Sequence, residues 1–90
     1  MDHQIELISY PAETPEYRAV LAEKKPIYQG EFFEAGRNDI RPECAFVIWT
    51  FEYNGETRIR YDGQIYSVYR RHPRKDDKIE LYCEVRLGEH

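Results

Sequence analysis

Two tight-turn dipeptides, Asn54-Gly55 and Asp62-Gly63, constrain the second half of this chain more than any other feature. Both are preferred in two-residue β-hairpin turns, because Asn, Asp and Gly accept the positive φ angles that such turns need. The segment before the first dipeptide, Cys44 to Tyr53, is rich in β-branched and aromatic residues. The sequence therefore predicts a strand here that turns at Asn54-Gly55 into a second strand, Thr57 to Tyr61.

Further strands are expected on both sides of these turns. They share an alternation of polar and apolar residues or an enrichment in strand-forming residues. The expected strands are Gln4–Ile8, Tyr17–Lys25, Ile65–Arg71 and Lys78–Arg86. The segment 17–25 fits a helix as well as a strand, and we favour the strand because the other strands need a pairing partner. Loops are expected between Pro11 and Pro15 and over residues 72–77.

A short helical insert is expected at Glu31 to Ala35, which Gly36 ends. So few residues do not hold a helix unaided. The acidic residues Glu31 and Glu34 fit the dipole at the start of a helix better than acid–base catalysis. The predicted fold is mainly β. It is a single domain over residues 1–90, a small antiparallel β-barrel or sandwich with a long loop carrying one short helix.

The composition is that of a folded domain with a thin core. Hydrophobic residues make up 41% of the 90 residues and charged residues 33%, which is too apolar for a disordered chain. The net charge of −4 gives no general attraction to nucleic acid or to an anionic membrane, and no apolar run approaches the length of a membrane span. Cys44 and Cys83 are interpreted as reduced, buried strand residues. A disulfide between them is the alternative, and it would need an oxidising compartment.

No residues form a recognisable catalytic or metal-binding pattern. Ser9, Ser67, Cys44, Cys83 and His72 are the candidates for nucleophilic chemistry, and none lies in a context that places a nucleophile beside a base. His, Cys and carboxylate residues do not cluster at the spacing of metal ligands. The sequence therefore predicts neither an enzyme nor a cofactor.

A basic cluster lies near the loop at residues 72–77. Tyr66 and Tyr69 are close in sequence to this cluster, which consists of Arg70, Arg71, Arg74 and Lys75 together with His72. Basic groups with aromatic rings on a small barrel are able to bind single-stranded nucleic acid. Two aspartates follow the cluster at once, and the simpler interpretation is a solvated, partly self-neutralised loop. A protein contact is the third possibility.

Phe32 and Phe33 are adjacent on the expected helix. Neighbouring helical residues point about 100° apart, so the two rings do not both face one small core. In the simpler interpretation one ring packs on the barrel and the other against a loop. In the alternative, the insert is an arm that contacts a neighbouring subunit.

Five short blocks stand in a fixed order between Glu23 and Gly88. They are Gln29–Gly36 with the pattern EF(Y/F)xAG, Arg41–Glu43 before an aromatic-rich strand, Tyr53–Glu56 (YNGE), Tyr61–Arg70 with the pattern Y(D/N)GxxYxIYR, and Asp77–Tyr82 (DxIELY). In this order and spacing they resemble the head-closure, or head–tail joining, proteins of tailed bacteriophages. The N-terminal third departs from the family, whose members usually open with a longer hairpin. Here the segment 9–16 is short and contains prolines.

The resemblance implies a structural protein of the head–tail connector. Such subunits form a ring, dodecameric on the connector, below the portal. The ring closes the DNA-filled head and provides the attachment surface for the tail. The implied partners are sister copies, a portal or adaptor protein and a tail-completion protein, with DNA only as passing cargo and no membrane. The implied location is the virion, and the host bacterial cytoplasm during assembly.

The family has no catalytic residues to transfer to this sequence. We expect the interfaces with sister copies or with the connector to include residues of the helical insert and of the basic cluster. These are Glu31, Phe32, Phe33, Glu34, Arg37, Arg70, Arg71 and Arg74.

Overall fold

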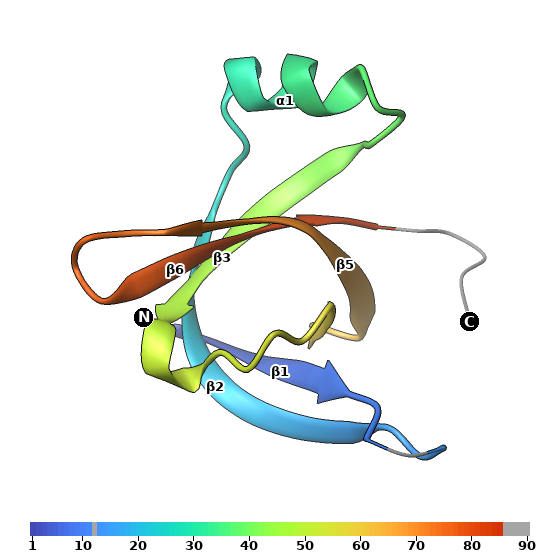
Figure 1. The fold of residues 1–90 in the computed structure, drawn as a ribbon, viewed down its shortest axis with the longest axis vertical. Helices are drawn as coiled ribbons and strands as arrows, with labels where there is room; N and C mark the ends of the chain where they lie inside the picture. Colours follow the sequence, from blue (N-terminus) through green and yellow to red (C-terminus); the bar gives the residue numbers. More distant parts are fainter. Residues whose placement is uncertain (12, 86–90) are drawn as a thin grey trace.

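The chain folds into a closed, antiparallel, six-stranded β-barrel with one α-helix outside it (Figure 1). The structure is a computed structural model that describes residues 1–11 and 13–85. Within these residues the elements are β1 (His3–Ser9), β2 (Glu16–Lys25), α1 (Gln29–Gly36), β3 (Pro42–Trp49), the 3-10 helix η1 (Thr50–Glu52), β4 (Arg58–Tyr61), β5 (Gln64–Pro73) and β6 (Lys78–Glu84). The predicted barrel, its single helix and the strand at residues 17–25 are confirmed.

The barrel closes through the order β1-β2-β3-β6-β5-β4. β1 lies between β2 and β4, and its pairing with β4 joins Glu6 to Arg60 and Leu7 to Ile59. β5 bends at an irregularity between Val68 and Arg70, where its pairing with β6 shifts. Such bulges curve a strand and help a small sheet to close.

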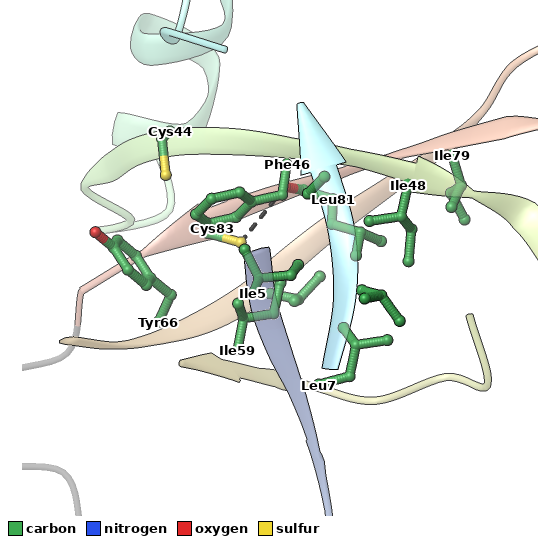
Figure 2. Packing of buried hydrophobic residues seen from close by; sticks show 13 residues of the cluster. Ile5, Leu7, Cys44, Phe46, Ile48, Ile59, Tyr66, Ile79, Leu81 and Cys83 are labelled. Atoms are coloured by element: carbon green, nitrogen blue, oxygen red, sulfur yellow. Dashed lines mark hydrogen bonds between the residues drawn. The ribbon is translucent and has the colours of Figure 1, made fainter. Parts of the chain in front are cut away.

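The barrel interior is filled by side chains that alternate along the strands (Figure 2). Phe46 is fully buried, and its ring meets the rings of Tyr61 and Tyr66 edge to face, at centroid distances of 5.4 and 5.6 Å. Cys44 and Cys83 are free thiols, both buried within this core in β3 and β6. Their predicted placement as small buried strand residues is confirmed.

The outer face of β3 is also covered. Ala45 and Val47 alternate with the core residues and are buried. Tyr82, the register partner of Ala45 on β6, is buried as well. Helix α1 contacts β3 from outside the barrel (Figure 1).

The predicted hairpin at Asn54-Gly55 is wrong. β3 ends at Trp49, the register partner of Lys78, and the backbone N–H of Thr50 donates to the carbonyl of Asp77 (2.8 Å). The next strand, β4, pairs with β1 and β5 and not with β3. The chain must therefore cross from one side of the barrel to the other, and η1 and residues 53–57 make this connection instead of a two-residue turn.

The second tight turn is confirmed. Asp62 and Gly63 have φ angles of 52° and 77° and join β4 directly to β5. Both residues are in the left-handed region, as a two-residue turn between antiparallel strands requires. β5 extends to Pro73, so His72 lies in a strand and the loop before β6 is shorter than predicted. Arg86, at the end of the last predicted strand, lies outside the described residues.

Candidate interaction surfaces

Helix α1 is attached to the barrel through a charged side chain. Glu31 is only 6% exposed, and its Oε1 accepts a hydrogen bond from Nη2 of Arg70 at 2.6 Å. The hydroxyl of Tyr69 donates to Oε2 of the same carboxylate at 2.8 Å. Ala35, one turn further along the helix, is the other buried residue of α1. The i, i+4 spacing puts Glu31 and Ala35 on one face, and this face turns toward the barrel.

The rest of the helix presents aromatic rings to solvent. Tyr28 at the N-cap, Phe32 and Phe33 are 62%, 52% and 64% exposed. The two phenylalanine rings contact each other edge to face, at a centroid distance of 6.5 Å. The simpler interpretation, in which one ring packs on the barrel, is wrong because the face toward the barrel belongs to Glu31 and Ala35. We call these three exposed residues the helix patch.

The arginines of the basic cluster each contact an acidic or aromatic partner. Arg70 binds Glu31, and its guanidinium lies over the ring of Tyr82 at 4.1 Å. The hydrogen bond to Glu31 raises the pKa of Arg70, although burial opposes this. Nε of Arg71 donates to the hydroxyl of Tyr53. Arg70 is therefore neutralised by a carboxylate, whereas the exposed Arg71 contacts a neutral hydroxyl.

Arg74, in the loop before β6, is also paired with acidic residues. Its guanidinium lies 2.7 Å from a carboxylate oxygen of Asp76 and 3.5 Å from one of Glu80. Glu80 in turn accepts a hydrogen bond of 2.8 Å from the hydroxyl of Tyr82. Burial, and then this hydrogen bond, raise the pKa of Tyr82 to about 12.

The two tyrosines considered for stacking with nucleic-acid bases do not form an exposed pair. Tyr66 lies in the barrel core and is 7% exposed. The ring of Tyr69 contacts Tyr82 edge to face at 6.3 Å, while its hydroxyl binds Glu31. Burial, and then the bond to this carboxylate, raise the pKa of Tyr69 well above its ordinary value.

A second exposed aromatic cluster lies at the far end of β3 and was missed by the sequence interpretation. The rings of Trp49 and Phe51 stack at 6.3 Å with an interplanar angle of 21°. Nζ of Lys78 lies 5.1 Å from the centre of the Trp49 ring. Phe51 is 78% exposed, the highest value among the large apolar side chains of the described residues. We call these three residues the Trp49 patch. The sequence signal was present in the aromatic residues at 49 and 51, but the strand predicted through 53 concealed it.

The predicted interface residues thus fall into three groups, of which one, Arg71 and Arg74, makes the contacts within the basic cluster described above. Phe32, Phe33, Glu34 and Arg37 are exposed on or beside α1, and the last two form a loose ion pair of 3.8 Å. Glu31 and Arg70 are brought together, but as the attachment of α1. Whether any of them contacts a partner stays a prediction.

Two further findings concern the described part of the chain. Among residues 1–11 and 13–85, no group of three or more His, Cys, Asp and Glu side chains is placed to hold a metal ion. The one α-helix described, α1, is far too short to cross a membrane.

Comparison with known proteins gives no relative: no family model, no curated protein and no solved structure matches this chain.

Proposed function

We propose that this protein is a ring-forming subunit of a phage head–tail connector, which closes the filled head and offers a surface to the tail. The observation that supports this best is the fixed helix α1. Its barrel-facing side is held by Glu31, so Phe32 and Phe33 are presented to solvent on a rigid support. A rigid, exposed aromatic pair is typical of a protein interface, because it loses little side-chain entropy on binding.

The barrel itself does not need these aromatic residues for its core. The interior is closed and filled by buried residues from all six strands. Large aromatic side chains outside such a core favour a protein partner over a role in folding. This supports an assembly subunit rather than an isolated domain.

The exposed aromatic residues form two different patches. The helix patch precedes β3 and the Trp49 patch follows it, so the two lie at opposite ends of that strand (Figure 1). A two-fold dimer uses one patch twice, whereas different patches on one subunit suit head-to-tail contacts and contacts between stacked layers. A ring that touches sister copies and also a protein above or below it needs several distinct surfaces. The order of the five sequence blocks described above points to the same class of protein.

The contacts of the arginine cluster favour this proposal over binding of single-stranded nucleic acid. Nucleic-acid sites of that kind combine cations available to phosphates with exposed rings for stacking. Here Arg70 binds Glu31, Arg74 binds Asp76, and Tyr66 is buried. The net charge of −4 also suits a channel that DNA passes without adhering.

Co-expression with the portal and adaptor proteins encoded by the same genome tests the proposal. We expect the chain to co-purify with them and to add a ring of density below the portal in electron micrographs. The double variant Phe32→Ser, Phe33→Ser should reduce this joining, while Glu43→Gln, at an exposed position of β3 outside the expected interface residues, should not. A chain that joins neither the portal side nor the tail side of its phage would contradict the proposal.

A further inference from the structure

Cys44 and Cys83 lie directly opposite each other on two neighbouring strands. They are register partners in the antiparallel pair of β3 and β6, and both are free thiols. Successive residues of a strand point to opposite faces, and both cysteines belong to the buried core of the barrel (Figure 2). The two side chains therefore leave their strands on the same side, toward the barrel interior.

The backbone separation of such a pair is the one that a disulfide needs. Directly opposite residues of antiparallel strands have Cα atoms about 4.5 or 5.5 Å apart, depending on their hydrogen-bonding position. Disulfides join cysteines whose Cα atoms are about 4.4–6.8 Å apart. The sequence contains two cysteines, so a disulfide within the chain joins these two.

The side chains fit a disulfide less closely than the backbone does. Directly opposite Cβ atoms of a sheet are about 4.5–5.5 Å apart, whereas a disulfide holds its Cβ atoms about 3.5–4.5 Å apart. Sγ of Cys83 donates to the carbonyl of Leu81 at 3.4 Å, so it points along β6 and has to turn toward Cys44. A bond here is therefore strained, and strained disulfides are readily reduced.

The strands can adjust at this position because their pairing is irregular on both sides. The pairing of β3 with β6 shifts register between Pro42 and Cys44. The pairing of β5 with β6 shifts between Val68 and Arg70, and Val68 is the register partner of Cys83. Such a shift interrupts the hydrogen-bonded ladder and bends the strand. Both cysteines thus lie where the backbone is held less tightly than in a regular sheet.

Both cysteines also lie near one end of their strands. β3 begins at Pro42, after the loop that follows α1, and β6 ends at Glu84. In the closed barrel Cys44 and Cys83 are only 2% and 0% exposed. Strand ends open more readily than the middle of a sheet, so opening this end of the barrel exposes both thiols while the other strands stay paired.

We propose that Cys44 and Cys83 form a reversible redox switch, in which a disulfide joins β3 to β6 and holds this end of the barrel closed. A low-molecular-weight disulfide such as oxidised glutathione is the oxidant. One cysteine thiolate attacks a sulfur of this disulfide and releases one glutathione thiolate. The other cysteine thiolate then attacks the mixed disulfide and releases the second. Two electrons pass from the protein to glutathione, and the two cysteine protons end on the two glutathione thiols.

The switch is a property of the barrel and is independent of the proposed function. In the dithiol state, the end of the barrel beside α1 opens by local fluctuation. In the disulfide state β3 and β6 do not separate there. Under the proposed function the chain meets both conditions, because the host cytoplasm keeps thiols reduced and the surroundings of a released virion are oxidising.

Refolding in glutathione buffers tests the switch on the unmodified chain. The chain is unfolded in urea and refolded at pH 8 at set ratios of oxidised to reduced glutathione, so that burial of the thiols does not prevent equilibrium. Free thiols are then blocked, and mass spectrometry measures the bond between Cys44 and Cys83. We expect a monomer that carries this bond and that an excess of reduced glutathione returns to the dithiol. The equilibrium constant for the bond should be at least about tenfold larger in the folded chain than in urea, because the fold places the two cysteines opposite each other.

Exchanging two neighbouring residues gives the matched control. The double variant Cys44→Ala, Ala45→Cys keeps the composition and moves the thiol by one position, to the outer face of β3. The barrel wall then separates the thiol from Cys83. The folded variant should therefore not form the bond within the chain, although in urea it should form it as readily as the wild type. The comparison of the folded wild type with its own unfolded chain needs no substitution, and it decides the matter if the variant does not fold.

Amide hydrogen exchange tests whether the bond holds the barrel end closed. Exchange around Cys44 and Cys83 should be at least about tenfold slower in the disulfide state than in the dithiol state, because separation of β3 from β6 is then blocked. The proposal is overturned if the folded wild type forms no bond between Cys44 and Cys83, or if its equilibrium constant does not exceed that in urea. It is also overturned if the folded variant forms the bond equally well, or if exchange is the same in the two states.

Discussion

Cys44 on β3 and Cys83 on β6 are register partners in adjacent antiparallel strands, and both thiols lie in the barrel core (Figure 2). Burial raises the pKa of Cys44 to about 11, with Lys24 opposing the change. Burial also raises the pKa of Cys83 well above its ordinary value, and the neighbouring Cys44 adds to this. Both groups therefore stay protonated near neutral pH.

This protonation predicts unreactive thiols in the folded protein. The thiolate is the nucleophile, so at pH 8 iodoacetamide should alkylate the native protein at least about a hundredfold more slowly than the urea-unfolded chain. Mass spectrometry of the single-thiol variants Cys44→Ala and Cys83→Ala would resolve the two rates. Equal rates in the native and unfolded chains would contradict the buried placement of the thiols.

The Glu31 carboxylate predicts how firmly α1 is held. In the variant Glu31→Gln, the ion pair with Arg70 is lost while the size of the side chain is kept. We expect a loss of about 1–2 kcal/mol in the free energy of unfolding, at the low end for a charged hydrogen bond because Arg70 is partly hydrated. Amide hydrogen exchange should also become faster across α1 than across the barrel strands.

Glu34→Gln is the matched control for this variant. Glu34 is on the same helix, but its side chain is 75% exposed and its partner Arg37 is 3.8 Å away. Its substitution should change the free energy of unfolding by less than about 0.5 kcal/mol. If the two variants had equal effects, the Glu31 carboxylate would not be the attachment point of the helix.

The strands could be predicted from the sequence because their signals are local. The alternation in β1 and β6 and the Asp62-Gly63 turn depend on neighbouring residues, and all three were predicted correctly. The helix was predicted at Glu31 to Ala35, and α1 contains these residues but begins two residues earlier, at Gln29, and includes Gly36. The attachment of α1 was not predicted, because Glu31 and Arg70 are far apart in the sequence and meet only after the barrel forms.

The path between β3 and β4 shows what a local signal does not decide. Asn54-Gly55 has the composition of a hairpin turn, and Gly55 does adopt a positive φ of 85°. The barrel nevertheless places β6 and β2 beside β3, and β4 lies across from it. Strand order depends on long-range pairing, so the turn residues serve a crossing connection instead. The same error concealed the exposed rings of Trp49 and Phe51.

Glu56, in the connection between β3 and β4, predicts how the free energy of unfolding depends on pH. The carboxylate is buried, and it accepts hydrogen bonds from Nη2 of Arg18 at 2.7 Å and from the backbone N–H of Asn54 at 2.9 Å. Burial alone would raise the pKa of Glu56, but the hydrogen bonds from Arg18 and the backbone outweigh it, and the pKa is lowered. The folded state therefore binds a proton more weakly than the unfolded chain does.

A lowered carboxylate pKa stabilises the fold above the pKa of the unfolded chain, about 4.3 for Glu, and this stability is lost as the pH falls through the folded value. At neutral pH, Glu56→Gln should lower the free energy of unfolding by about 1–3 kcal/mol. The difference from the wild type should shrink below pH ~4. Urea unfolding between pH 7 and pH 3 measures this difference in the free energy of unfolding. A difference that is independent of pH would contradict the role of the charged carboxylate.

The turn between β4 and β5 predicts that a side chain at position 63 lowers the stability of the fold through backbone conformation alone. Gly63 has a φ of 77°, and a Cβ added there would meet no heavy atom within 4 Å. Steric overlap with the rest of the protein is thus excluded, and Gly63→Ala should destabilise the fold by about 1 kcal/mol because alanine disfavours the left-handed region.

Gly36→Ala is the matched control, since Gly36 at the end of α1 has equal space and no positive φ. Alanine also has the higher helix propensity, so this variant should be neutral or slightly more stable. Urea unfolding midpoints compare the two, and equal midpoints would show that the turn conformation does not limit the residue at position 63.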